Sequence, residues 1–250
     1  MTHPHENPHE TLDVTAPIEG VVHVRLDRRT ELNAIDERLL NELAETVESV
    51  TAEETHVLLL SGSGDRAFSV GADIRNRIDD MDAETAFELS KLGQDVFDAV
   101  AEFPGPVIAC IDGYCLGGGM ELAACADLRI ASPDSTFGQP EHDHGLIPGW
   151  GGTQRLPHLI GPHRAKQVVF TASEFDAETM RQYGFVTELA ASPLEIGMEY
   201  AEALTEYAPS VHRYAKRAIE TQHGDHAFAY ESLAFAFLVA RDMSAANNRS

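Results

Sequence analysis

Three consecutive glycines followed closely by a glutamate mark the part of the chain best suited to chemistry. They lie in CLGGGMELAACADL, residues 115–128, directly after the apolar stretch 107–111, so they mark a turn from a strand into a helix. The start of a helix presents unpaired N–H groups and a positive field, which can stabilise an oxyanion. Glu121 follows the glycines, and Glu141 lies in FGQPE further along the chain. Two carboxyl groups beside an anion-binding backbone indicate acid–base chemistry on a carbonyl compound.

The elements that must position these residues alternate between strands and helices. The hydrophobic pattern predicts strands at 21–26, 56–60, 107–111 and 128–131. It predicts helices at 36–50, 84–102 and 118–125, with a loop rich in glycine and serine at 61–72. This alternation is typical of an α/β fold with parallel strand pairing.

From Pro162 onward the pattern is helical. Helices are predicted at 164–171, 177–183, 194–207, 210–222 and 226–241. The last of them is so apolar that we expect it to pack on the core or on a neighbouring subunit. We therefore expect a disordered polar tail at 1–12, a core at 13–195 and a C-terminal helical region at 196–250.

The chain is strongly acidic. Its 41 acidic and 18 basic residues give a formal net charge of −23, spread along the whole sequence. Such a charge disfavours nucleic acid and anionic membranes as partners. It is typical of halophilic enzymes, in which salt screens the repulsion between surface charges, so we expect loss of activity or structure at low ionic strength.

The three cysteines give no sign of an oxidising compartment. Cys110, Cys115 and Cys125 are odd in number and lack CxxC spacing, which fits small apolar residues in a reducing environment. There is no signal-peptide pattern and no apolar run of the length needed to span a membrane. We therefore expect a cytoplasmic protein that does not associate with membranes.

Four motifs, taken together, resemble one family. They are NAI at 33–35, FSVGADI at 68–74, CLGGGMELAACADLRIAS at 115–132 and FGQPEHDHGLIPGWGGTQRL at 137–156. Their order and spacing closely resemble the enoyl-CoA hydratase/isomerase (crotonase) superfamily over about residues 20–225. The resemblance implies a spiral of ββα units with a C-terminal helical region, and an oxyanion hole for a thioester carbonyl.

The resemblance also implies roles for single residues. The oxyanion donors would be the N–H groups of Ala72 and Gly118. Glu121 would activate water, and Glu141 would exchange a proton at the α-carbon, although coupled carboxylates can share this work. The N–H of Gly149 would orient Glu141. The segments that contain Ala34, Asp73, Ile74 and Arg75 would contact coenzyme A, with Arg75 either at a CoA phosphate or in solvent.

Three residues depart from the family pattern. His142 and His144 stand where apolar residues are usual, and such a pair is only part of a zinc site. We expect no metal, since no third ligand is evident, and interpret them as a polar pocket wall or as outward-facing side chains. Trp150 stands where a smaller residue is common, and it could shorten or flatten the acyl pocket.

The prediction for the whole chain is an enoyl-CoA hydratase that needs no cofactor, because CoA is part of the substrate. The alternative within the same fold is a Δ3,Δ2-enoyl-CoA isomerase or another acyl-CoA lyase. A non-catalytic family member, binding RNA or serving a structural role, is a third hypothesis that the acidic charge and the two glutamates disfavour. By resemblance we expect a homotrimer or a dimer of trimers.

Overall fold

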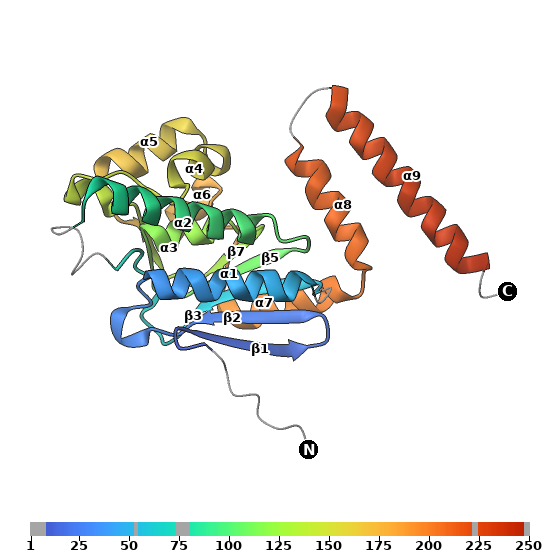
Figure 1. Ribbon diagram of the computed structural model, residues 1–250, viewed down its shortest axis with the longest axis horizontal. Coiled ribbons are helices and arrows are strands. Elements are labelled where there is room, and N and C mark those ends of the chain that lie inside the picture. The colour runs from blue at the N-terminus through green and yellow to red at the C-terminus, as the bar shows by residue number, and fades with distance from the viewer. Residues whose placement is uncertain (1–8, 53–54, 74–80, 222–224, 248–250) are drawn as a thin grey trace, which may run out of the picture.

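The computed structural model describes residues 9–52, 55–73, 81–221 and 225–247, with the backbone alone at 225 and 241–247. Most of the body is built on a six-stranded sheet with the order β1-β2-β3-β5-β7-β10 (Figure 1). Neighbouring strands of this sheet are parallel, except for β1 and β2, which are antiparallel. The strands are β1 (Leu12–Ile18), β2 (Val21–Leu26), β3 (Val57–Gly62), β5 (Val107–Ile111), β7 (Leu128–Ala131) and β10 (Glu188–Leu189).

A second, smaller sheet has the order β4-β6-β8-β9. Its strands are β4 (Ala67–Ser69), β6 (Tyr114–Leu116), β8 (Thr136–Gly138) and β9 (Phe175–Asp176). The first three are parallel to one another, and β9 is antiparallel to β8. Each of these three follows a strand of the large sheet, so the chain passes from the large sheet to the small one three times.

After each passage from the large sheet to the small one, the chain continues into a helix. The first two are β3–β4–α2 and β5–β6–α3, and the third runs through β7, β8 and the 3-10 turn η3 into α4. This is the spiral of ββα units that the sequence predicted. The helices are α1 (Glu37–Ala52), α2 (Ala83–Ala101), α3 (Gly118–Ala123), α4 (Gly152–Ile160), α5 (Pro162–Thr171), α6 (Ala177–Tyr183), α7 (Pro193–Thr205), α8 (Pro209–Glu220) and α9 (Asp225–Asn247); the 3-10 turns include η1 (Arg29–Glu31) and η3 (Pro140–His144).

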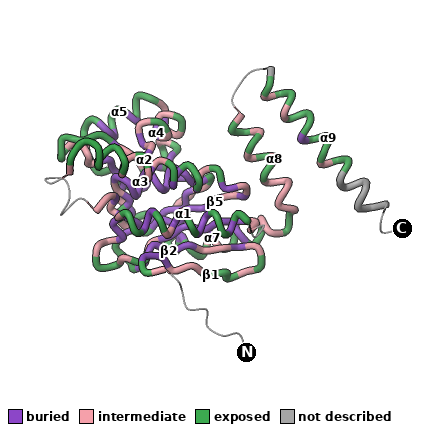
Figure 2. Tube along the Cα trace, in the orientation of Figure 1, coloured by how far each residue is buried: buried purple, intermediate pink, exposed green. Residues whose placement is uncertain are grey.

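The central strands are buried on both faces, as Figure 2 shows. In β3, Leu58 and Leu60 join the main core, whereas Val57 and Leu59 join a smaller cluster that includes Ala201 of α7. Alternate residues of a strand point to opposite faces, so an unbroken apolar run is what a strand covered on both sides requires.

Several elements differ from those expected. Strand β1 begins at Leu12, and Thr11 is buried and bonded to Glu42, so the structure extends into the expected tail. Strand β4 lies inside the segment expected to be a loop, and α3 ends earlier than expected, at Ala123. Strands β1, β6, β8, β9 and β10 and helix α4 were not predicted. Strands β4, β6 and β8 are three residues long, and β9 and β10 only two, which is too short to show a hydrophobic period.

Helices α8 and α9 extend away from the sheets (Figure 1). Lys216 of α8 contacts the body through Asp127, at 2.9 Å. Large apolar side chains of α9 are exposed: Phe228, Leu233, Phe235, Phe237 and Val239. Among the described residues, no helix combines the length and apolar character that crossing a membrane would take.

Candidate active site

The small sheet brings the predicted site residues together. Ala72 follows the end of β4, Gly118 the end of β6 and Glu141 the end of β8. Because these three strands are parallel neighbours, their carboxyl ends meet at one edge of the sheet. Ligands of α/β proteins commonly bind at such an edge. This placement explains why residues from three distant motifs share one site.

A cavity of about 660 Å³ opens at this edge. Its wall contains both glutamates and both predicted oxyanion donors, so four residues chosen from sequence face the same space. Helix α2 and the loop after Glu141 form much of the remaining wall. That part of the lining is mainly apolar and consists of Met81, Ala86, Leu89, Ser90, Gln94, His144, Leu146, Ile147, Pro148, Gly149, Trp150 and Thr153.

Two backbone N–H groups are aimed into this cavity. The carbonyl of Gly71 accepts a hydrogen bond from the N–H of Ile35 at 2.7 Å, and the carbonyl of Gly117 accepts one from the N–H of Glu121 at 3.0 Å. In a trans peptide the C=O and the following N–H point in opposite directions. Holding each carbonyl on the protein side therefore turns the N–H of Ala72 and of Gly118 toward the cavity.

Glu121 is almost wholly buried, with 2% of its surface exposed. Its Oε1 accepts hydrogen bonds from the N–H of Trp150 at 2.9 Å and of Gly152 at 2.7 Å. Gly152 is the first residue of α4, so the carboxyl also lies at a positive helix end. Burial raises the pKa of Glu121, and the two N–H groups and Arg155 oppose this shift. The second oxygen, Oε2, receives no hydrogen bond from the described residues and is free to act on a water.

Glu141 lies in the turn η3 and is half-buried. Burial raises its pKa to about 7, its own backbone N–H opposes the shift, and the charge of Glu121 adds to it. The amide of the fully buried Gln139 faces both carboxyl oxygens, at 2.9 and 3.0 Å, and donates to them when its nitrogen is turned toward them. A carboxyl with a pKa near neutrality is suited to both giving and taking a proton.

Trp150 lines the cavity and packs against both α2 and α3. A Cβ on Gly93 would lie 2.2 Å from the indole, and one on Gly118 would lie 2.5 Å from it, so both helices need glycine where the ring passes. The ring also meets Phe97 edge to face, with centroids 5.5 Å apart. The indole therefore lies directly beside Gly118, one of the two predicted oxyanion donors; that it shortens or flattens the acyl pocket stays a prediction.

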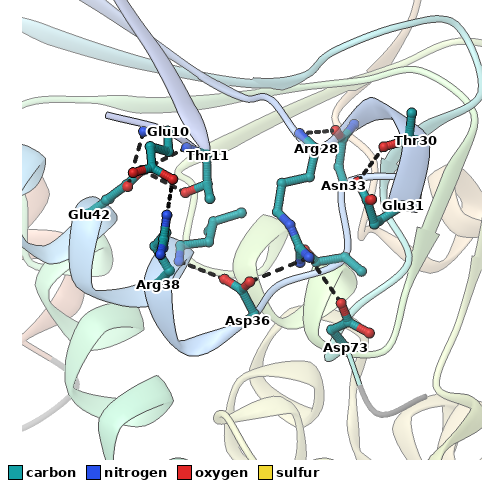
Figure 3. Close-up of polar contacts among 12 residues, drawn as sticks. Glu10, Thr11, Arg28, Thr30, Glu31, Asn33, Asp36, Arg38, Glu42 and Asp73 are labelled. Carbon is teal, nitrogen blue, oxygen red and sulfur yellow. Dashed lines mark hydrogen bonds and ion pairs between the residues drawn. The ribbon is translucent and has the colours of Figure 1, made fainter. Parts of the chain in front are cut away.

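The residues expected to contact CoA fall into three groups. Ala34 lines the cavity. The carboxylate of Asp73 accepts a hydrogen bond from Arg28 at 3.1 Å, and Arg28 also donates to the carbonyl of Ala34 at 2.6 Å (Figure 3). Arg28 therefore links the Ala34 and Asp73 segments at one edge of the cavity. Ile74 and Arg75 lie outside the described residues.

A second hollow, of about 480 Å³, lies over this edge and is lined by charged groups. Most of these groups bond to one another, as Figure 3 shows for Arg28 with Asp36 and for Arg38 with Glu10. Because these charged side chains already neutralise one another, the hollow offers a ligand little unpaired charge to bind.

Gly149 lines the cavity, and its carbonyl accepts from Ser90 at 2.8 Å and from Gln94 at 2.9 Å. The sequence predicted that its N–H would orient Glu141. In the structure, the N–H groups of this loop that bind a carboxyl are those of Trp150 and Gly152, and the carboxyl is that of Glu121.

The remaining candidates contribute little to this site. His144 lines the cavity, and His142 stacks obliquely with Phe170, their centroids 6.0 Å apart. The described residues contain no group of three metal-binding side chains. All three cysteines are buried and free, and burial raises the pKa of Cys110 and of Cys125 to about 12. Such thiols are poor nucleophiles at neutral pH.

Four important residues were missed from the sequence: Trp150 and Gly152 as ligands of Glu121, Gln139 beside Glu141, and Asn33, whose carbonyl accepts a hydrogen bond from Ser69. The segment GWGGT does carry a signal, because glycines at a helix start are suited to binding a carboxylate through the backbone. Asn33 and Gln139 gave no signal beyond their place in a motif.

Comparison with known proteins points the same way as the geometry. Residues 17–237 match a family model described as "Enoyl-CoA hydratase/isomerase". The "Crotonyl-CoA hydratase" of Syntrophomonas wolfei is 41% identical over 66% of this chain and 63% of its own length. The "Short-chain-enoyl-CoA hydratase" of Clostridium acetobutylicum is 36% identical over 86% of this chain and 84% of its own. A crystal structure of an enoyl-CoA hydratase from Bacillus anthracis superimposes with a TM-score of 0.88 at 33% identity, covering 92% of each chain.

Proposed function

The chain belongs to the enoyl-CoA hydratase/isomerase family, and we propose that it is an enoyl-CoA hydratase. It adds water reversibly, in the syn sense, to a 2-trans-enoyl-CoA and forms a 3-hydroxyacyl-CoA. The observation that carries this proposal is the pair of glutamates, one buried and one half-buried, that face one cavity beside two inward-pointing N–H groups. Its hydratase relatives in Syntrophomonas and Clostridium support the same reaction.

The chemistry follows from this arrangement. The thioester oxygen accepts hydrogen bonds from the N–H groups of Ala72 and Gly118, which stabilise the enolate that forms when water attacks C3. Glu121 takes one proton from that water, and its hydroxide part bonds to C3. Glu141 gives its proton to C2, and the enolate collapses to the thioester. One hydrogen of the water stays in the new hydroxyl group, and the other replaces, on the pair of glutamates, the proton given to C2. Overall the substrate is neither oxidised nor reduced, so no electron acceptor or donor is needed.

We predict that kcat/KM follows a bell-shaped pH profile. Hydration begins with Glu121 ionised and Glu141 protonated, so the active pair holds one proton. Because the pKa of Glu141 is raised to about 7, kcat/KM should fall as pH rises above that value and the pair loses its proton. In acid, protonation of Glu121 removes the base. The reaction consumes no net proton, so hydration and dehydration should give the same profile. Initial rates from about pH 5 to about 9 in both directions test this, and a rate that stays level in alkali would contradict it.

The direct test of function is loss of the conjugated-enoyl absorbance of crotonyl-CoA. A hydratase bleaches this band, whereas a Δ3,Δ2-enoyl-CoA isomerase leaves the 2-enoyl thioester intact. The assay belongs in a KCl series that reaches molar concentrations, because we also propose that the charge of −23 makes the fold depend on salt. No bleaching at any salt would exclude hydration, and equal rates in dilute buffer would contradict the salt dependence.

We also propose that the chain assembles as a homotrimer or a dimer of trimers through its C-terminal helices. The support is the exposed apolar surface of α9, where Phe235 and Leu233 are each 71% exposed. Monomeric proteins rarely expose such a surface over a whole helix. Assembly would cover it.

Replacing Leu233 and Phe235 together by Asp should therefore lower the assembly mass, because two charges would have to be buried in the interface. Light scattering after size-exclusion chromatography in high salt measures this mass. Glu231→Gln is the control, since Glu231 is an exposed polar residue on the same helix. An unchanged mass for the double variant would place the interface elsewhere.

A further inference from the structure

We propose that Ser69 and Asn33 are positioning residues for the reaction, acting through the peptide that carries the N–H of Ala72. This inference rests on the proposed function, because it concerns the oxyanion hole of the same site. Neither side chain lines the cavity. Both are wholly buried, behind the loop that Ala72 belongs to.

Ser69 links two loops through its hydroxyl. Its Oγ donates to the carbonyl of Asn33 at 2.7 Å and accepts from the N–H of Gly71 at 3.1 Å. The carbonyl of Gly71 is held in turn by the N–H of Ile35 at 2.7 Å. Both polar groups of Gly71 are therefore fixed, and they set the plane of the next peptide. That plane determines where the N–H of Ala72 points.

Asn33 is the anchor of this arrangement. Its amide nitrogen donates to the carbonyls of Ser63 at 3.0 Å and of Ala67 at 2.8 Å. Its amide oxygen accepts from the N–H of Arg28 and from the hydroxyl of Ser63, both at 3.1 Å. Every hydrogen-bonding position of the amide is thus filled. Figure 3 shows the amide of Asn33 beside the backbone nitrogen of Arg28.

The backbone around Asn33 is also unusual. Leu32 and Asn33 both have φ of +55°, in the left-handed region. Such conformations persist in non-glycine residues only where the surroundings fix them, and they concentrate at functional sites. The three hydrogen bonds that join the Asn33 amide to the backbone of Arg28, Ser63 and Ala67 supply that constraint. The result is a rigid support on which the Ser69 hydroxyl rests.

A rigid support matters here because the two donor loops touch. A Cβ on Gly71 would lie 2.7 Å from the backbone nitrogen of Gly118, so any shift of Gly71 changes the distance between the two donors. Stabilisation of an oxyanion depends on donors held in place before the charge develops. Loss of the Ser69 hydroxyl would leave the N–H of Gly71 without its partner and loosen the plane of the following peptide.

Ser69→Ala tests this, with Ser63→Ala as its matched control. Both serines are buried, both bond to Asn33, and both variants remove one hydroxyl without adding atoms. Only Ser69 reaches Gly71, and Ser63→Ala leaves the three bonds of the Asn33 amide to the backbone in place. We expect Ser69→Ala to lower kcat for crotonyl-CoA by about tenfold with KM within about twofold, as for an interaction made mainly in the transition state. We expect Ser63→Ala to keep kcat within about twofold while lowering the melting temperature comparably.

A spectroscopic measurement separates positioning from general loosening. The absorption band of hexadienoyl-CoA, a conjugated dienoyl thioester, moves to longer wavelength when its carbonyl accepts hydrogen bonds. The shift for bound ligand does not depend on the fraction of active enzyme. It should be smaller in Ser69→Ala than in the wild type and in Ser63→Ala.

Equal shifts in all three proteins, or an equal loss of kcat in both variants, would overturn the proposal. A wild-type protein that shifts the band but hydrates no enoyl-CoA would instead refute the proposed function and leave the positioning role standing.

Discussion

Glu121→Gln and Glu141→Gln are each expected to lower kcat for hydration by about 10²–10⁴-fold, the usual worth of a general acid or base. Glutamine keeps the shape of the side chain but cannot exchange a proton. At position 121 the amide oxygen can still accept from the N–H groups of Trp150 and Gly152, so the local structure should persist. Turnover of crotonyl-CoA at saturating concentration measures the effect.

Binding should separate this loss of chemistry from a loss of structure. Calorimetric titration with butyryl-CoA, which has no double bond to hydrate, should give similar affinities for the wild type and both variants. Asp143→Asn is the matched control, because Asp143 lies in the same turn as Glu141 but is exposed. Its kcat should stay within about twofold, since an exposed charge seldom matters to a buried site. Wild-type turnover by either glutamine variant would refute the role of that glutamate.

Gly71→Ala is expected to lower kcat by about 10²-fold or more, the cost of losing one oxyanion donor. A Cβ at this position would lie 2.7 Å from the nitrogen of Gly118 and 2.8 Å from the carbonyl oxygen of Leu116, which are both backbone atoms. Neither can move aside alone, so the two loops must separate. The φ of +88° adds strain for any residue with a side chain. Steady-state rates and the hexadienoyl-CoA band report the result.

The control is Gly184→Ala. Gly184 also has a positive φ, of +92°, but its nearest neighbour to a Cβ is a carbonyl oxygen at an ordinary 3.5 Å, and it caps α6 away from the cavity. The two variants should therefore carry a similar backbone cost and differ in their effect on the site. If Gly184→Ala lost as much activity as Gly71→Ala, strain alone would explain the loss.

Four of the six strands of the large sheet were predicted from their apolar residues, whereas β1 and β10 were not. Val21–Leu26, Val107–Ile111 and Leu128–Ala131 have the predicted bounds, since each is a mainly apolar segment ended by polar or turn residues. The ββα spiral was expected from family resemblance and is confirmed by the passages between the two sheets.

The small sheet could not be predicted from the residues alone. Strands of three residues have no period, and their pairing joins segments far apart in the chain. Yet this sheet aligns Ala72, Gly118 and Glu141. The contacts that define Glu121 are equally remote in sequence, because its partners Trp150 and Gly152 lie 29 and 31 residues away. Motifs name the reacting groups, whereas only the tertiary structure shows what holds them.

The raised pKa values of the two glutamates also make the stability of the fold depend on pH. Unfolding returns Glu141 to water and to its ordinary pKa of 4.5, from about 7 in the folded state. The folded chain therefore holds a proton that the unfolded chain releases, and the free energy of unfolding must fall as pH rises from about 4.5 through about 7. Glu121 shifts in the same direction. Above neutrality the fold forgoes an amount on the order of 1–3 kcal/mol at Glu141, so the groups that make this chain reactive also make it less stable at neutral pH than in mild acid.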